Sequence, residues 1–350
     1  MVAEQDEPSN LYPLTKGKNM STTNTIQIPL TAHHIRFTAR VETPIHFNDF
    51  KGSALRGSFT NIMQRTFCPQ WRADETDPQH LAFCPVCQLL AVEQDMTISG
   101  DVRRPYSIEP PLNVQNDFRP GESFQFSVNL YGDKLGYIPY LVLAAGGMGE
   151  MGVGRKNRDG ERGRFSVIQI DAVNPLNGET LTMMTPDERL VHDRTLPVNH
   201  AEIEQVTERL LAQLAQQDNQ LRIRFLTPTR IVSNKQTLKQ PDFFPLCKQV
   251  VLRVMDLCAQ HGAGRPDVIL KRDIYGYADQ VKLVRDNSTW WDVQGYSGRL
   301  ERKQVLGGLI GEAVYHSPDW RPLLPWLLWG MSTHVGKNIV KGCGIYEVGL

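Results

Sequence analysis

The chain has 350 residues, enough for two domains or one large one, and 41% of them are apolar, enough to build hydrophobic cores. The 38 Lys and Arg residues balance the 38 Asp and Glu residues. The sequence contains no run of 18 or more apolar residues, which excludes a membrane-spanning helix, and six cysteines are too few for a disulfide scaffold. We therefore expect a cytoplasmic protein in a reducing compartment, with no membrane partner.

The zero net charge conceals an asymmetry between the two halves. Residues 220–350 carry 18 basic and 11 acidic side chains, whereas residues 1–219 carry 20 basic and 27 acidic ones. This distribution favours a C-terminal half that binds an anion. Residues 1–27 are polar and lack the apolar stretch of a secretion signal, so we expect a disordered leader there.

The first half, residues 28–219, shows the pattern of one mixed domain. Apolar and polar residues alternate over residues 34–41, which predicts a strand, and the apolar stripe of residues 53–67 predicts a helix. Residues 68–88 have the composition of an inserted loop. Further elements are expected in this order: strands at 106–110 and 123–131, a short apolar helix at 137–145, a strand at 165–170 and a helix near 201–216.

The second half, residues 220–350, repeats this order. It is expected to contain a strand at 221–226, a helix at 242–260, strands at 281–284 and 305–315, a helix at 319–331 and a last strand at 345–348. Each half thus follows the order of a split β-α-β-β-α-β unit. The sequence predicts an α+β fold of two tandem ferredoxin-like (RRM-like, βαββαβ) domains, with a cysteine-containing insertion in the first.

Residues 146–164 are rich in glycine and arginine. They include a G-x-G-x-x-G pattern at Gly147, Gly149 and Gly152, but a dinucleotide site needs such glycines after a strand, and here an apolar helix precedes them. We predict a loop whose glycines let backbone N–H groups approach phosphates, since arginine forks bind phosphate oxygens in pairs. The basic residues of this loop are Arg155, Lys156, Arg158, Arg162 and Arg164. The alternative is a solvated surface hairpin.

A second glycine-rich loop is predicted over residues 334–344, between a helix and the last strand. Its lysines, Lys337 and Lys341, alternate with glycines that would let an RNA backbone come close to the protein backbone. The alternative is a tight connection with incidental lysines.

The segment 44–57 joins the first strand to the first helix and carries His46, Lys51 and Arg56. RNA cleavage without a metal needs a base for the 2′-hydroxyl, an acid for the leaving 5′-oxygen and a cation for the phosphorane. Histidine suits the first two roles near neutral pH, and lysine or arginine suits the third. An ordinary surface histidine is the alternative for His46.

The cysteines of the inserted loop have the spacing of a zinc knuckle. Cys84 and Cys87 flank a Pro-Val pair, Cys68 lies upstream, and His80 inside the same loop would supply a fourth ligand. A structural zinc ion is therefore one interpretation, and a set of buried free thiols is the other.

Taken together, the chain resembles the CRISPR repeat-RNA endoribonucleases of the RAMP superfamily, the sixth CRISPR-associated family. The resemblance covers about residues 28–350. It rests most on segments 304–311 (QVLGGLIG), 323–330 (LLPWLLWG), 334–337 (HVGK) and 342–344 (GCG), and less on 50–57 (FKGSALRG). The cysteine loop is similar to an insertion in some relatives, which carry four cysteines where this chain has three.

The resemblance implies two ferredoxin-like domains and cleavage of precursor CRISPR RNA within each repeat. The products would carry a 5′-hydroxyl and a 2′,3′-cyclic phosphate, and no cofactor would be needed for catalysis. His46 lies where many members of the family place their histidine, and His334, beside the C-terminal loop, is the competing candidate. The expected partners are CRISPR repeat RNA or crRNA and other CRISPR effector subunits.

Two other functions fit the same sequence. One is a non-catalytic RNA-binding subunit of a CRISPR effector complex, which would have the same fold and the same loops. The other is a zinc-stabilised protein-interaction module, which would have no affinity for RNA at physiological salt.

Overall fold

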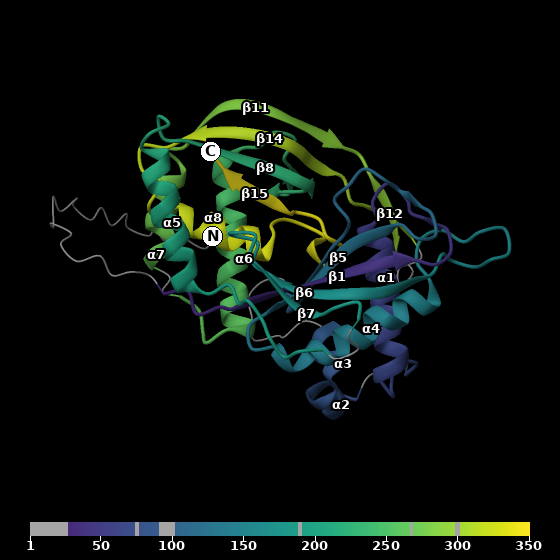
Figure 1. The fold of residues 1–350 in the computed structure, drawn as a ribbon. Coiled ribbons are helices and arrows are strands. Elements are labelled where there is room, and N and C mark those ends of the chain that lie inside the picture. Colours follow the sequence, from purple (N-terminus) through teal and green to yellow (C-terminus); the bar gives the residue numbers. More distant parts are fainter. Residues whose placement is uncertain (1–26, 74–76, 91–101, 188–190, 267–268, 298–301) are drawn as a thin grey trace, which may run out of the picture.

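Figure 1 shows the computed structural model, which describes residues 27–73, 77–90, 102–187, 191–266, 269–297 and 302–350. The leader predicted over residues 1–27 lies outside the described residues, apart from Gln27. Within these ranges, no helix is both long and apolar enough to cross a membrane.

The first half of the chain forms a five-stranded antiparallel sheet in the order β3-β5-β1-β6-β7. Its strands are β1 (Ala32–Val41), β3 (Tyr106–Glu109), β5 (Ser123–Tyr131), β6 (Phe165–Val173) and β7 (Thr180–Met184). Strict alternation along β5 buries Phe124, Phe126 and Val128. They share one core with residues of the helices α1 (Gly52–Phe67) and α4 (Ile138–Met151).

The second half forms a four-stranded antiparallel sheet in the order β11-β14-β8-β15. Its strands are β8 (Gln220–Thr229), β11 (Lys282–Trp291), β14 (Gly308–His316) and β15 (Tyr346–Gly349). Its helices α6 (Phe243–His261) and α8 (Leu324–Thr333) pack against each other, and their buried side chains join those of β8 in a second core. Two further helices, α5 (His200–Leu214) and α7 (Ile269–Ala278), pack on α8 and α6.

Both sheets follow the strand order of a βαββαβ unit, with β7 added to the edge of the first. The tandem ferredoxin-like fold expected from the sequence is therefore confirmed. The domain boundary between residues 219 and 220 stays a prediction. Because Ile203, Val206 and Leu214 of α5 belong to the core of the second domain, the packing favours a boundary before His200.

Short elements complete the fold. The segment 68–88 was expected as a loop, but its described part contains two short helices, α2 (Pro78–Phe83) and α3 (Pro85–Leu90), of which α3 contacts α1 (Figure 1). Small antiparallel pairs and 3-10 turns occupy the connections: β2 (Ile45–His46) with β4 (Asp117–Phe118), β9 (Val232–Ser233) with β10 (Gln236–Thr237), β12 (Gln294–Ser297) with β13 (Arg302–Val305), η1 (Leu135–Tyr137) and η2 (Ile339–Lys341).

The glycine-rich loop predicted over residues 146–164 begins later than expected, because α4 continues to Met151. Two of its glycines, Gly147 and Gly149, serve helix packing instead. A Cβ on Gly149 would lie 2.1 Å from the carbonyl oxygen of Phe165, and one on Gly147 would lie 3.0 Å from Ile62. These glycines let α4 approach β6 and α1, so only residues 152–164 remain as a loop.

Candidate functional site

His46 lies on the surface of the first domain at the end of β2. Its side chain is 48% exposed, and its Nδ1 atom lies 2.7 Å from Oδ1 of Asp117. Its neighbours in sequence, Ile45 and Phe47, are buried and fix the backbone on both sides. The imidazole is therefore accessible to solvent while its backbone is held by the core.

Lys51 and Arg56 lie at the start of α1. The buried Lys51 ammonium donates a hydrogen bond to the carbonyl oxygen of Asn113, 2.7 Å away, and burial lowers the pKa of Lys51. Arg56 is half-buried, and its Nε has no hydrogen-bond partner among the described residues. Its charge also contributes to the lowered pKa of Lys341, although burial is the larger cause.

The basic loop of residues 152–164 folds back beside β2. The amide of Arg155 donates to the carbonyl oxygen of His46 over 2.7 Å, and the backbone of Gly154 and Gly163 contacts β2 so closely that a Cβ would clash. All five basic side chains predicted to hold RNA are exposed here: Arg155, Lys156, Arg158, Arg162 and Arg164. One of them, Arg162, also donates to the carbonyl oxygen of Gly154 within the loop.

The C-terminal loop of residues 334–344 reaches the other end of the same segment. A Cβ on Gly52 would lie 1.8 Å from the carbonyl oxygen of Lys341, and one on Gly342 would lie 2.3 Å from Pro110. Lys337 is exposed, whereas Lys341 is 8% exposed and donates to Gln304. Both cationic loops thus touch segment 44–57, one at β2 and the other at the start of α1.

His334 occupies a different environment from His46. It is fully buried at the end of α8, where its Nε2 lies 3.1 Å from Oε1 of Glu109. Glu109 also accepts from Nδ1 of His34 at 3.3 Å and from Nδ2 of Asn129 at 2.7 Å. This network joins the two domains, and its burial weighs against direct contact between His334 and a substrate.

The charges of this network follow from its hydrogen bonds. Burial alone would raise the pKa of Glu109, but the hydrogen bonds from His334 and His34 outweigh it and hold that pKa well below its ordinary value. Burial lowers the pKa of His334, against the opposing effect of Glu109. The carboxylate is therefore ionised, and the neutral form of His334 is favoured.

A groove lies between the two domains next to Lys51. It has a volume of about 750 Å³ and is lined by Lys51 and residues 110–114 on one side, and by Arg224 and Trp291 of the second sheet on the other. Trp291 packs edge-on against Phe50, with ring centroids 6.3 Å apart. A smaller adjoining pocket is lined by Asp117 and Arg155, and both pockets share Asp49 and Asn116.

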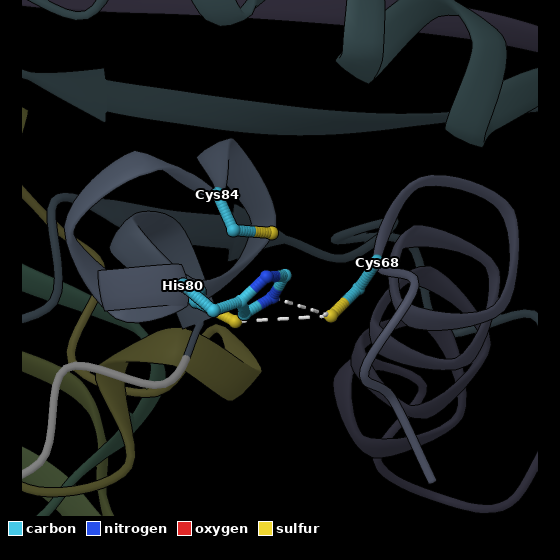
Figure 2. Close-up of side chains that lie close together, drawn as sticks. Cys68, His80 and Cys84 are labelled. Atoms are coloured by element: carbon cyan, nitrogen blue, oxygen red, sulfur yellow. Dashed lines mark hydrogen bonds between the residues drawn. The ribbon is translucent and has the colours of Figure 1, made fainter. Parts of the chain in front are cut away.

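Three cysteines and one histidine converge in the insertion. Figure 2 shows Cys68, from the end of α1, facing His80 of α2 and Cys84 between α2 and α3. Sγ of Cys68 lies 3.3 Å from Nε2 of His80 and 3.8 Å from Sγ of Cys87, and the four donor atoms lie within 4.8 Å of one another. The sequence therefore predicted a set of residues that the fold brings together.

The sequence did not identify two residues next to the candidate site. Asp117, which pairs with His46, lies in a two-residue strand with no periodic pattern. Gln304, which accepts from Lys341 and donates to Asn338, lies in a hairpin that was not predicted. Neither position carries a sequence signal that could have identified it.

Two family models match the chain. Residues 30–196 match a model described as an N-terminal domain (AF_1859_N), and residues 223–346 match the model of the CRISPR-associated endoribonuclease Cas6. No curated protein matches the sequence to a significant degree.

Solved structures match nearly the whole chain. Thermus thermophilus Cas6 (TTHB231) is 13% identical with a TM-score of 0.52, and the match covers 91% of this chain and 98% of that one. A product complex of Cas6 (TTHB231) is 11% identical with a TM-score of 0.51, and the match covers 90% of this chain and 98% of that one. A chain of a partial Cas6-RT-Cas1–Cas2 complex is 10% identical with a TM-score of 0.56, covering 93% of this chain and 47% of that one. At these identities the likeness shows the fold.

The fold is that of two tandem ferredoxin-like domains, which the solved Cas6 structures share. Its C-terminal domain carries the match to the Cas6 family of CRISPR-associated endoribonucleases, which confirms the resemblance inferred from the sequence motifs.

Proposed function

We propose that this protein binds CRISPR repeat RNA and cleaves precursor crRNA to mature crRNA by a metal-independent transesterification. The family match over residues 223–346 supports an RNA endonuclease. The observation that carries the proposal is the position of His46, an exposed imidazole on the segment that both cationic loops touch.

The proposed reaction uses groups of segment 44–57. The 2′-oxygen of one ribose attacks the adjacent phosphorus and the bond from phosphorus to the 5′-oxygen breaks, leaving a 2′,3′-cyclic phosphate and a 5′-hydroxyl. One group must accept the 2′-hydroxyl proton and another must donate a proton to the 5′-oxygen, and His46 serves as the base or the acid. Lys51 is only 5% exposed but lines the groove, and its charge, with that of Arg56, counters the negative charge of the phosphorane.

The bound strand is proposed to follow the basic loop and the groove between the domains. The exposed side chains of residues 155–164 contact phosphates, as does Lys337, whereas the burial of Lys341 weighs against direct contact with RNA. Of the two adjacent tryptophans, Trp290 lies under Nζ of Lys239, 3.2 Å from its ring centroid, while Trp291 lines the groove. Trp291 is therefore the residue available to stack on a base.

Cleavage of repeat RNA in EDTA tests the metal-independent mechanism. We expect cleavage to continue, and loss of cleavage by protein that remains folded in EDTA would contradict the mechanism. His46→Ala should reduce the single-turnover rate by about 100-fold or more with RNA affinity retained. The control is His316→Ala at the end of β14, which should keep the wild-type rate.

Phosphate contacts are tested by the salt dependence of binding. Arg158→Gln should weaken RNA binding by a few kcal/mol at most and flatten the slope of log K against log salt by about one. The matched control is Arg209→Gln, on the exposed side of α5, which should leave that slope unchanged.

The alternative function is a non-catalytic RNA-binding subunit of a CRISPR effector complex, and it predicts the same affinity for repeat RNA. Single-turnover incubation separates the two, because such a subunit would bind the repeat tightly without cutting it. Failure of both binding and cleavage at physiological salt would favour a protein-interaction module instead.

We further propose that Cys68, His80, Cys84 and Cys87 hold a structural zinc ion. A tetrahedral site with Zn–S bonds of about 2.3 Å has sulfur–sulfur edges of about 3.8 Å, and the Cys68–Cys87 distance is 3.8 Å. Burial, together with the hydrogen bond to Cys68, raises the pKa of Cys87 to about 12, so zinc would bind by displacing thiol protons. The ion would tie α2 and α3 to the end of α1.

Zinc content of the purified protein tests this site. We expect about one zinc ion per chain in the wild type and a loss in Cys84→Ser. The control is Cys258→Ser, a buried thiol in the core of the second domain, which should keep its zinc. Equal zinc content in the wild type and Cys84→Ser would contradict the proposal.

A further inference from the structure

Asp117 faces His46 across the small sheet formed by β2 and β4. The two residues are direct partners in the antiparallel register, as are Ile45 and Phe118. Directly opposed residues of an antiparallel pair project to the same face. Ile45 and Phe118 point into the core, whereas His46 and Asp117 are 48% and 69% exposed.

Buried neighbours hold the backbone of this pair in place, although the two side chains themselves are exposed. The amide of Phe47 donates to the carbonyl oxygen of Asn116 over 2.8 Å, extending the β2–β4 pairing by one bond. The rings of Phe47 and Phe118 meet edge to face, with centroids 6.0 Å apart, and both are 1% exposed. Buried neighbours thus fix the backbone positions of His46 and Asp117, from which Nδ1 and Oδ1 come within 2.7 Å of each other.

A carboxylate at Nδ1 has a defined chemical effect on an imidazole. It accepts a hydrogen bond from Nδ1–H, leaves the Nε2 lone pair free in the neutral ring, and stabilises the imidazolium that forms when Nε2 takes a proton. Arg155, Asp49 and Asp292 line the same pocket as Asp117, which has a volume of about 660 Å³. The His46 ring, however, makes its hydrogen bond with Asp117, whose carboxylate oxygen accepts it.

We propose that Asp117 is the positioning residue for His46: it holds the imidazole in the Nδ1–H tautomer with Nε2 directed at the reacting oxygen of the RNA. This inference rests on the proposed function, because it assigns His46 the proton transfer. It adds to that function a residue 71 positions away in the sequence, on the opposite strand.

Nitrogen NMR of the imidazole tests the tautomer without any RNA. We expect neutral His46 in the wild type to carry its proton on Nδ1, and Asp117→Asn to shift the ring toward the Nε2–H form. A wild-type His46 that carries its proton on Nε2 would overturn the inference by itself, whether or not the protein cleaves RNA.

Single-turnover cleavage tests the consequence. Asp117→Asn should lower the rate by at least about tenfold with RNA affinity unchanged, and Asp117→Glu should restore part of it. The control Asp273→Asn, an exposed carboxylate on α7, makes the same charge change and should keep the wild-type rate.

The outcomes separate the two proposals. Absence of cleavage by the wild type refutes the proposed function, while the NMR result still decides whether Asp117 sets the tautomer. Cleavage by Asp117→Asn at the wild-type rate, or a loss of rate explained entirely by weaker RNA binding, refutes the positioning role.

Discussion

Replacing Glu109 by alanine should weaken the joint between the two domains. Glu109 accepts hydrogen bonds from His334, His34 and Asn129, and its side chain is only 24% exposed. After the substitution Asn129 keeps its bond to Ser107, 3.2 Å away, but the two imidazole donors lose their acceptor. Each orphaned buried donor costs about 1–3 kcal/mol. Because some water reaches the site, we expect a total loss of about 2–4 kcal/mol in the free energy of unfolding.

Urea unfolding of the wild type and of Glu109→Ala measures this loss. The control Glu208→Ala removes an exposed carboxylate from α5 and should change the stability by less than about 0.5 kcal/mol. A double-mutant cycle with His334→Asn, which keeps a polar side chain at that position, should give a coupling energy of about 1 kcal/mol or more. A loss below about 1 kcal/mol for Glu109→Ala, or additivity in the cycle, would refute the reasoning.

Two other predictions concern the pH dependence of stability and the close contact between the backbone at Gly52 and that at Lys341. Burial lowers the pKa of His33 to about 4 from 6.5, so between these pH values the unfolded chain binds a proton that the folded chain does not. Stability should therefore fall by about 3 kcal/mol as the pH drops through this window, and His33→Gln should flatten that dependence of the melting temperature. Gly52→Ala should destabilise the protein, because its Cβ would lie 1.8 Å from the carbonyl oxygen of Lys341. In the same helix, Gly57→Ala meets nothing within 4 Å and should raise the melting temperature slightly, so equal effects of the two substitutions would contradict this account.

Local patterns determined most of the secondary structure. Alternation predicted β5 over its full length, because each of its residues faces either the core or the opposite side of the sheet. The apolar stripe of α1 predicted that helix to within a residue. The spacing of Cys84 and Cys87 also indicated their cluster, since a short knuckle brings two thiols together whatever the surrounding fold.

The same reasoning did not anticipate that two glycines and one lysine would be packed against other parts of the fold. Gly147 and Gly149 were assigned to a phosphate-binding loop, but they allow close approach of α4 to its neighbours. Lys341 was assigned to RNA, but the C-terminal loop packs against the first domain and buries it. The residues next to a position in the sequence do not show which of its faces another domain will cover.

The sequence by itself determined the strand and helix order of each half, the cysteine cluster and the histidine on segment 44–57, because periodicity and short spacings are local properties of the chain. Only the tertiary structure decided that His46 is exposed beside Asp117 while His334 is buried against Glu109. These pairs join residues 71 and 225 positions apart. Their formation depends on the register of β2 with β4 and on the position of the end of α8 beside β1 and β3, and neither is encoded in a local pattern.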